Sequence, residues 1–312
     1  MTSRLTPDHA LLYSELYKIR RFEETLLENF SRGLFFGTTH TYLGQEANAV
    51  GVLSHLQKSD IVFSNHRGHG HYLASGGDLR SLFAELMGRS TGVCGGRGGS
   101  QHLHWGNFYS NGVQGGILPV ATGMALAEKL KLSGAVVIAF LGDGTLGEGV
   151  VYESLNMASL WKVPLLFVLE NNRIAQTTPI DLAVAGGIQE RFTAFGIPAI
   201  ALDTSDVVDI LIASQEIISQ VRSTGTSRAI ILHTYRFGPH SKGDDTRPAE
   251  EIAAYRQQRD PVRIQASRLD EPVRDSIEDK INMQISSALE EALAEPFPSL
   301  GSIHDQADPT AG

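Results

Sequence analysis

A carboxylate and an amide follow two apolar runs of the sequence. The two side chains are about thirty residues apart, and this spacing favours a functional pair over a chance match. Asp143 follows the apolar run 135–141, and Asn172 follows the run 163–169. The sequence between the runs is compatible with a helix, so the unit is predicted to be a strand, a helix and a parallel strand. Neighbouring strands lie roughly 4.8 Å apart, and ligands of open α/β sheets bind beyond their carboxyl ends. We therefore expect Asp143 and Asn172 to share one ligand.

The residue types at this point favour a magnesium ion and a diphosphate. Carboxylate and amide oxygens are hard donors of the kind that magnesium prefers. Gly142 and Gly144 flank Asp143 and would let the backbone approach a bulky phosphate, which the amides of the following helix can bind. Gly-Asp-Gly alone usually marks only a turn, so the prediction depends on its spacing from Asn172.

The elements that must position these residues alternate along the chain. Such alternation predicts an α/β fold with a mainly parallel sheet and helices on both faces. The predicted helices cover residues 8–32, 119–134 and 205–222, with another beginning near residue 44 and more between 252 and 293. The predicted strands include a short one from residue 61 and two at 195–202 and 228–235.

Polar and glycine-rich segments follow or precede these elements. His40 precedes a predicted helix, and Arg67 follows a predicted strand, where it is suited to bidentate contact with a phosphate. His66, His69 and His71 lack the spacing of a helical zinc-binding pair, so we do not predict a zinc site there. Residues 90–118 are rich in glycine and aromatic side chains, which is typical of a long, ordered and functional loop.

Composition narrows the class of protein. The chain has 312 residues, 42% of them hydrophobic and 20% charged, which is enough for one large α/β domain. A formal net charge of -9 with no basic face argues against a nucleic-acid binder. No apolar run approaches the ~20 residues of a membrane span, and the N-terminus has no secretory signal. The single cysteine, Cys94, excludes an internal disulfide. We expect a cytoplasmic protein without nucleic-acid or membrane partners.

Six ordered motifs support a family resemblance that covers residues 10–295. They are THTYLGQEA, HRGHG, GGRGGSQH, NFYSNGVQGG, the unit from GDG to NN, and TYRFGPHSKGDD. In this order they resemble the alpha subunit of the thiamine diphosphate-dependent decarboxylating component of 2-oxo acid dehydrogenase complexes. Pyruvate, branched-chain and acetoin dehydrogenases belong to this group. The resemblance implies a thiamine diphosphate-binding domain over residues 1–295. The composition of residues 296–312 predicts a flexible tail.

The resemblance also implies residue roles. Magnesium would be bound by Asp143, Asn172 and the backbone carbonyl of Ile174. Catalytic histidines near the reacting thiazolium would be His40 and His240. The residues that would contact the cofactor are His66, Arg67, Gly112, Gln114, Gly142, Asp143, Gly144, Thr145, Asn172, Ile174 and His240.

Some positions depart from the pattern of this family or carry an additional implication. Gln101 replaces the methionine that is usual before His102, and Ile174 replaces a common tyrosine. Pro239 precedes His240 where relatives often have glycine or histidine, and it restricts the loop on the substrate side. Ser241 matches the serine that is phosphorylated in mitochondrial relatives.

The resemblance further implies a partner. Enzymes of this family need a glutamate against the aminopyrimidine ring, supplied by a second, pyrimidine-binding domain. After residue 252 the chain is too short and lacks the strand-helix alternation for such a domain. We therefore expect a separate beta subunit, a heterotetramer of two alpha and two beta chains, and no activity of this chain alone. A lipoyl acyltransferase is a further candidate partner.

Alternatives of other classes remain at this point. The N-terminal half of a split transketolase-like enzyme carries the same magnesium motif, and a catalytically silent regulatory or structural subunit would have the same fold. A nicotinamide-dependent enzyme is less favoured because no GxGxxG opens a strand-helix unit. The substrate is also open, because HRGHGH resembles the acetoin type and GPHSKGDD is similar to the branched-chain type as well. Besides the acetoin and branched-chain types, a third candidate is a specialised biosynthetic enzyme that makes an unusual acyl group.

Overall fold

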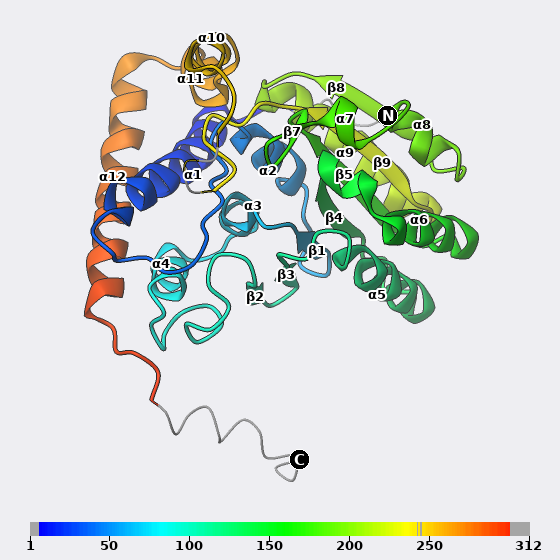
Figure 1. The fold of residues 1–312 in the computed structure, drawn as a ribbon, viewed down its shortest axis with the longest axis horizontal. Coiled ribbons are helices and arrows are strands. Elements are labelled where there is room, and N and C mark those ends of the chain that lie inside the picture. Colours follow the sequence, from blue (N-terminus) through cyan, green and yellow to red (C-terminus); the bar gives the residue numbers. More distant parts are fainter. Residues whose placement is uncertain (1–5, 242, 244, 300–312) are drawn as a thin grey trace.

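A seven-stranded sheet forms the centre of the molecule in the computed structural model, which describes residues 6–241, 243 and 245–299 (Figure 1). Its strands are β1 (Ile61–Ser64), β2 (His104–Trp105), β3 (Phe108–Ser110), β4 (Val137–Gly142), β5 (Leu165–Asn171), β8 (Ala199–Asp203) and β9 (Arg228–His233). Their order is β2-β3-β1-β4-β5-β9-β8, and all neighbours are parallel except β2 and β3. The short strands β6 (Ile174–Ala175) and β7 (Thr178–Pro179) form a separate antiparallel pair. The predicted α/β class with a mainly parallel sheet is confirmed.

Helices cover both faces of the sheet, because alternate strand residues point to opposite sides. Ile138 and Phe140 of β4 belong to one core cluster, whereas Val137 and Ala139 belong to the other. The first cluster is covered by α1 (His9–Phe30), α2 (Glu46–Leu53), α3 (Gly68–Ala74), α4 (Leu79–Leu86), α9 (Val207–Thr224) and α12 (Glu271–Ala294). The second is covered by α5 (Ile117–Lys131), α6 (Gly149–Trp161), α7 (Ile180–Ala183) and α8 (Ile188–Thr193). Of the remaining helices, α11 (Pro261–Ala266) adds Val262 to the first cluster and the 3-10 helix η1 (Asp143–Gly147) adds Leu146 to the second. Helix α10 covers Ala249–Arg259.

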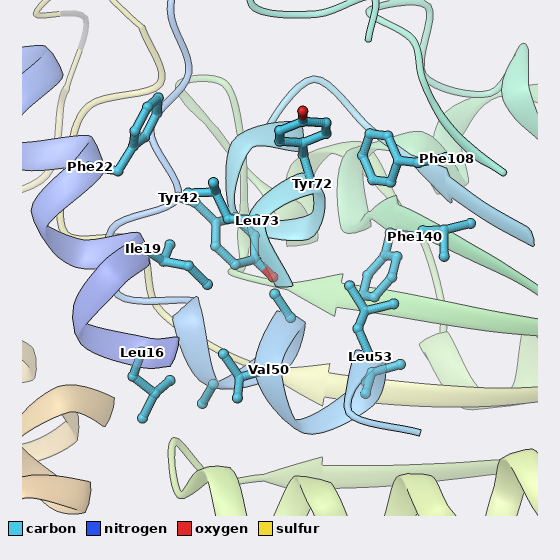
Figure 2. Close-up of a cluster of buried hydrophobic side chains, with 14 of the residues drawn as sticks. Leu16, Ile19, Phe22, Tyr42, Val50, Leu53, Tyr72, Leu73, Phe108 and Phe140 are labelled. Carbon is cyan, nitrogen blue, oxygen red and sulfur yellow. The ribbon is translucent and has the colours of Figure 1, made fainter. Parts of the chain in front are cut away.

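The larger core places the predicted site loops next to one another. Figure 2 shows the Tyr42 ring among side chains of α1, α2 and α3, close to Ile19 and Leu73. A Cβ atom on Gly70 would come within 2.2 Å of the Tyr42 ring, so only glycine allows α3 to pack this closely. The segment before α2, which carries His40, is therefore fixed against the start of α3.

Most predicted elements agree with the structure, and the differences have local causes. The helix predicted over residues 8–32 is α1, which ends at Phe30 and is followed by Gly33 with a φ of 69°. The strand predicted from residue 195 begins only at Ala199, because Phe195 and Gly196 form a turn after α8. The helix predicted after Gly144 begins as η1, and α6 starts at Gly149.

The beginning of the predicted C-terminal tail contacts the domain. The backbone oxygen of Pro296 accepts a hydrogen bond from the Ser90 amide at 2.9 Å, and the Arg89 guanidinium lies 4.0 Å from the centre of the Phe297 ring. Residues 300–312 of that predicted tail lie outside the described residues. Among the helices of the described part of the chain, none is long and apolar enough to cross a bilayer.

A buried ion-pair network joins three helices of the first face. Arg20 of α1 donates to Glu46 of α2 at 2.7 Å and to both carboxylate oxygens of Asp260, the N-cap of α11, at 3.0 and 2.9 Å. Burial raises the pKa of Glu46, although the nearby Arg20 opposes this effect. The network thus stabilises the position of α2 only while all three charges are present.

We expect Arg20→Met to lower the free energy of unfolding by about 3–5 kcal/mol, because it leaves two buried carboxylates without their cation. Urea unfolding at pH 7 measures the change. Lys18→Met, on the same helix, removes a partly exposed pair with Glu15 and should cost no more than about 1 kcal/mol. Equal losses in the two variants would contradict the role given to the network.

Candidate active site

The twelve residues predicted for cofactor, metal or catalysis line a single cavity of about 420 Å³. They come from the carboxyl ends of β1, β4, β5 and β9, from the segment before α2, and from the loop before α5. The residues are His40, His66, Arg67, Gly112, Gln114, Gly142, Asp143, Gly144, Thr145, Asn172, Ile174 and His240. Strands β4 and β5 are neighbours in the sheet, with Gly142 paired to Glu170, so Asp143 and Asn172 leave the same edge.

Asp143 presents an oxygen that lacks a partner. The carboxylate is 2% exposed, and its Oδ1 accepts a hydrogen bond from the Gly144 amide at 2.9 Å. The buried Oδ2 has no hydrogen-bond partner within the described residues. Burial raises the pKa of Asp143 to about 6, although backbone amides oppose the shift. A cation at Oδ2 would offset the cost of burying this charge.

The Asn172 side chain is held in place on both sides. Its Nδ2 donates to Gln45 Oε1 at 3.3 Å, and its Oδ1 accepts from the Ile174 amide at 3.2 Å. An amide oxygen has two lone pairs, so Oδ1 can still bind a cation. The donor set of Asp143, Asn172 and Ile174 therefore fits a hard divalent cation such as magnesium.

The two glycines around Asp143 differ in what they permit. A Cβ atom on Gly142 would have no heavy atom within 4 Å, so the space beside it is open. A Cβ atom on Gly144 would lie 2.7 Å from the Ala175 Cβ. Gly142 thus leaves room for a ligand. Gly144 lacks a side chain that would clash with Ala175, so η1 can pack against β6.

Arg67 is a buried cation that faces the cavity. It is 3% exposed, and its Nη1 donates to the Thr41 carbonyl oxygen at 2.7 Å. No carboxylate forms an ion pair with it in the part of the chain that the structure describes. Burial, followed by the positive charge of Arg236, lowers the pKa of Arg67 to about 9, so the guanidinium remains protonated at neutral pH. A phosphate in the cavity would supply the missing negative charge.

Three imidazole rings meet at the same cavity. The His40 ring centre lies 4.7 Å from that of His66 and 4.6 Å from that of His240. Burial lowers the pKa of His66 well below its usual value, with a further contribution from Arg67. Ring nitrogens of the three histidines lie within 4.8 Å of one another, a cluster that could hold a metal ion. The adjacent Arg67 guanidinium makes the cluster better suited to an anionic ligand.

The histidines that are neighbours in sequence separate in the fold. Of the three histidines in the HRGHGH motif, only His66 lines the cavity. The His69 ring forms hydrogen bonds with the Glu23 carboxylate at 3.2 Å and with the Ser100 hydroxyl at 2.9 Å. The His71 ring forms a hydrogen bond with the Ser64 hydroxyl at 2.8 Å. His69 and His71 therefore contact other partners than His66 does.

Seven further residues line the cavity that were not predicted from the sequence. They are Gln45, Asn65, Gln101, Glu148, Glu170, Ala175 and Gln176. Glu170 is 2% exposed and accepts hydrogen bonds from Tyr42, from Asn48 at 3.1 Å and from Asn65 at 3.2 Å. Burial alone would raise the pKa of Glu170, but the nearby His71 and these hydrogen bonds outweigh it and lower that pKa. Its position at the end of an apolar run, two residues before Asn172, was the signal that could have identified it.

A buried carboxylate organises the glycine-rich loop that leads into the site. Glu85 of α4 is 1% exposed and accepts hydrogen bonds from four backbone amides. These belong to Cys94 at 2.6 Å, Gly96 at 2.9 Å, Gly98 at 2.7 Å and Gly99 at 3.0 Å. The loop continues to Gln101, which lines the cavity, so Glu85 positions this wall of the site.

We expect Glu85→Gln to release this loop, because an amide NH₂ cannot accept from the backbone donors that a carboxylate oxygen satisfies. Amide hydrogen exchange of residues 94–99 should accelerate, and the free energy of unfolding should fall by about 1–3 kcal/mol. Glu295→Gln provides a control, because its carboxylate pairs only with the partly exposed Arg80 among the described residues. Unchanged exchange in Glu85→Gln would contradict the role of this carboxylate.

Comparisons with known proteins show the family of this chain. The dehydrogenase E1 component family model matches residues 14–300. The alpha subunit of acetoin:2,6-dichlorophenolindophenol oxidoreductase from Bacillus subtilis is 40% identical, over 77% of this chain and 74% of that protein. Its counterpart from Cupriavidus necator is 36% identical over 96% of each chain. The alpha subunit of the pyruvate dehydrogenase E1 component from Zymomonas mobilis is 36% identical, over 92% of this chain and 84% of that protein. The chain therefore belongs to the dehydrogenase E1 component family, as a chain of the alpha-subunit type.

Proposed function

We propose that this chain binds magnesium and thiamine diphosphate and, with a beta subunit, oxidatively cleaves a 2-oxo acid or acetoin. The acyl group would pass to a lipoyl group or another acceptor. The observation that carries the proposal is the pairing, in one cavity, of the unpartnered Asp143 Oδ2 with the buried Arg67 cation. The carboxylate oxygen favours a bound cation and the buried guanidinium favours a bound anion. A magnesium diphosphate supplies both charges.

Different cavity residues would bind different parts of the cofactor. Asp143, Asn172 and the Ile174 carbonyl would hold magnesium, and Arg67 with His66 would face the diphosphate. The backbone at Gly142, Gly144 and Thr145 would pass beside the phosphates, where the open space at Gly142 supports a close approach. Gly112 and Gln114 would contact the aminopyrimidine ring.

Thiamine diphosphate, when bound, supplies a carbon nucleophile for the substrate carbonyl and accepts the electron pair released when the C–C bond breaks. The task of this chain is then orientation and proton handling. His40 and His240 would donate hydrogen bonds toward the oxygen on which negative charge develops.

A beta subunit would complete the site. Two glutamates line the cavity in addition to Asp143, and both are engaged within the chain. Glu170 is held by Tyr42 and two asparagines, and Glu148 accepts from the Gly115 amide at 3.2 Å. An activating glutamate from a partner is therefore part of the proposal, within a heterotetramer of two alpha and two beta chains. A lipoyl acyltransferase would be the next partner.

Turnover with the beta subunit tests the proposal. The chain, mixed with its proposed beta subunit, would receive magnesium, thiamine diphosphate and 2,6-dichlorophenolindophenol as electron acceptor. Pyruvate, branched-chain 2-oxo acids and acetoin would be offered in turn. We expect dye reduction with one of these substrates, only when both chains are present.

Other outcomes would favour the alternatives. Ketol transfer between sugar phosphates, without dye reduction, would point to the split transketolase-like enzyme. Failure to bind thiamine diphosphate with the beta subunit present would contradict the proposal and favour a silent subunit. The names of the relatives, which include acetoin and pyruvate enzymes, give these two substrates priority.

A further inference from the structure

The two proposed catalytic histidines share one feature, since each has its Nδ1 beside a nitrogen donor. Gln101 Nε2 lies 3.0 Å from His40 Nδ1, and Arg67 Nη2 lies 3.3 Å from His240 Nδ1. A guanidinium has donors but no acceptor. His240 Nδ1 must therefore accept the hydrogen bond from Arg67, and a neutral His240 carries its proton on Nε2.

For His40 the same assignment depends on the orientation of the Gln101 amide. A Cβ atom placed on Gly112 would lie 2.2 Å from Gln101 Oε1, so the amide oxygen rests against the Gly112 backbone. The amide nitrogen is then on the side of His40. Glycine at position 112 leaves space for the Gln101 side chain at this place, because a larger residue would displace the amide.

We propose that Gln101 is a positioning residue that holds His40 as the neutral tautomer with its proton on Nε2. The His40 ring is 5% exposed and lies against His66 and His240, so it has little freedom to turn. Protonation of His40 Nδ1 would place two N–H groups against each other, which disfavours the imidazolium. The consequence of this tautomer for catalysis rests on the proposed function, whereas the tautomer itself does not.

The consequence is a matched pair of donors. Both His40 and His240 would use Nδ1 to accept a bond from the protein and keep Nε2–H for other partners. Two neutral N–H donors in one cavity can stabilise a developing oxyanion without first gaining a proton. The Gln101 side chain would thereby set the protonation state in which His40 works, a task like that of the orienting group behind a catalytic histidine.

Nitrogen NMR of the histidine side chains tests the tautomer directly. The full chain would be labelled with ¹⁵N-histidine and studied without cofactor, and His40→Gln would identify the His40 signals. We expect the wild type to show Nε2–H at His40 and Gln101→Met to show both tautomers. Gln101→Glu should move the proton to Nδ1 and raise the pKa of His40, since a carboxylate only accepts. An Nδ1–H signal in the wild type, or no change in Gln101→Glu, would overturn the proposal.

The pH dependence of turnover with the beta subunit tests the positioning role. Gln101→Met should lower kcat about two- to tenfold with unchanged affinity for thiamine diphosphate, because one orienting hydrogen bond is lost. Gln101→Glu should shift the acidic limb of the kcat profile to higher pH. The exposed Gln258 on α10 gives a control, Gln258→Met, that should leave the profile unchanged. An unchanged profile in both Gln101 variants would overturn the role, while inactivity of the wild type on every substrate would overturn only the proposed function.

Discussion

Asp143→Asn is expected to abolish magnesium-dependent binding of thiamine diphosphate and, in the same protein, to stabilise the cofactor-free chain. The free energy of unfolding at pH 7.5 should rise by about 2–3 kcal/mol in Asp143→Asn. The reason is that the pKa of the Asp143 carboxyl is about 6 in the folded chain, compared with an ordinary value of 3.8. Between these two values the folded state binds more protons than the unfolded state, so stability falls as the pH rises. Above pH 6 the wild type therefore carries a buried charge that asparagine does not have.

Denaturant unfolding without magnesium at pH 4 and pH 7.5, together with calorimetric titration of the cofactor, measures both effects. The gain from Asp143→Asn should be small at pH 4 and full at pH 7.5. Asp60→Asn is a control of opposite sign, since Asp60 is also buried but pairs with Arg222 at 2.7 Å. Loss of stability in Asp143→Asn would contradict the raised pKa of this carboxyl, and retained magnesium-dependent binding would contradict its assignment as a metal ligand.

Arg67→Met is expected to weaken thiamine diphosphate binding about thirty- to several thousandfold, because the phosphate loses a desolvated cation that costs 2–5 kcal/mol to remove. Arg67→Lys keeps the charge but loses the planar fork, so it should fall between the wild type and Arg67→Met. Calorimetry with thiamine diphosphate and with thiamine, which lacks phosphate, separates the two contributions.

The comparison of the two ligands decides the meaning of the result. We expect the Arg67 variants to lose affinity for thiamine diphosphate and to bind thiamine as the wild type does. The pKa of Arg67 is lowered by burial and Arg236, so replacing it should not remove a stabilising ion pair from the cofactor-free fold. Equal loss of both ligands would show that Arg67 shapes the cavity and does not bind the diphosphate.

The proximity of Asp143 and Asn172 could be predicted from sequence because both residues follow strands that are close in the topology. Asp143 and Asn172 end consecutive strands of one strand-helix-strand unit, and such strands often pair. The register of β4 and β5 places the two ends at one edge of the sheet. The same local reasoning predicted the order of most helices and strands.

The rest of the site depends on packing between distant segments. Gln45 supports Asn172, and Gln101 supports His40, across separations of 127 and 61 residues. Neither contact leaves a periodic signal in the sequence. The position of Glu170 at the end of an apolar run indicates that it lies at the edge of the sheet, but it gives no indication of partners such as Tyr42, 128 residues away. The spatial cluster of His40, His66 and His240 also comes from three separate loops.

Calorimetric titration of thiamine diphosphate into the chain with its beta subunit is the most direct measurement of the central claim. We predict saturable binding that requires magnesium, disappears in Asp143→Asn and weakens strongly in Arg67→Met. Gln258→Met should bind as the wild type does. Binding that is indifferent to magnesium and to Asp143, or no binding by the wild-type pair, would contradict the assignment of this cavity as a magnesium diphosphate site.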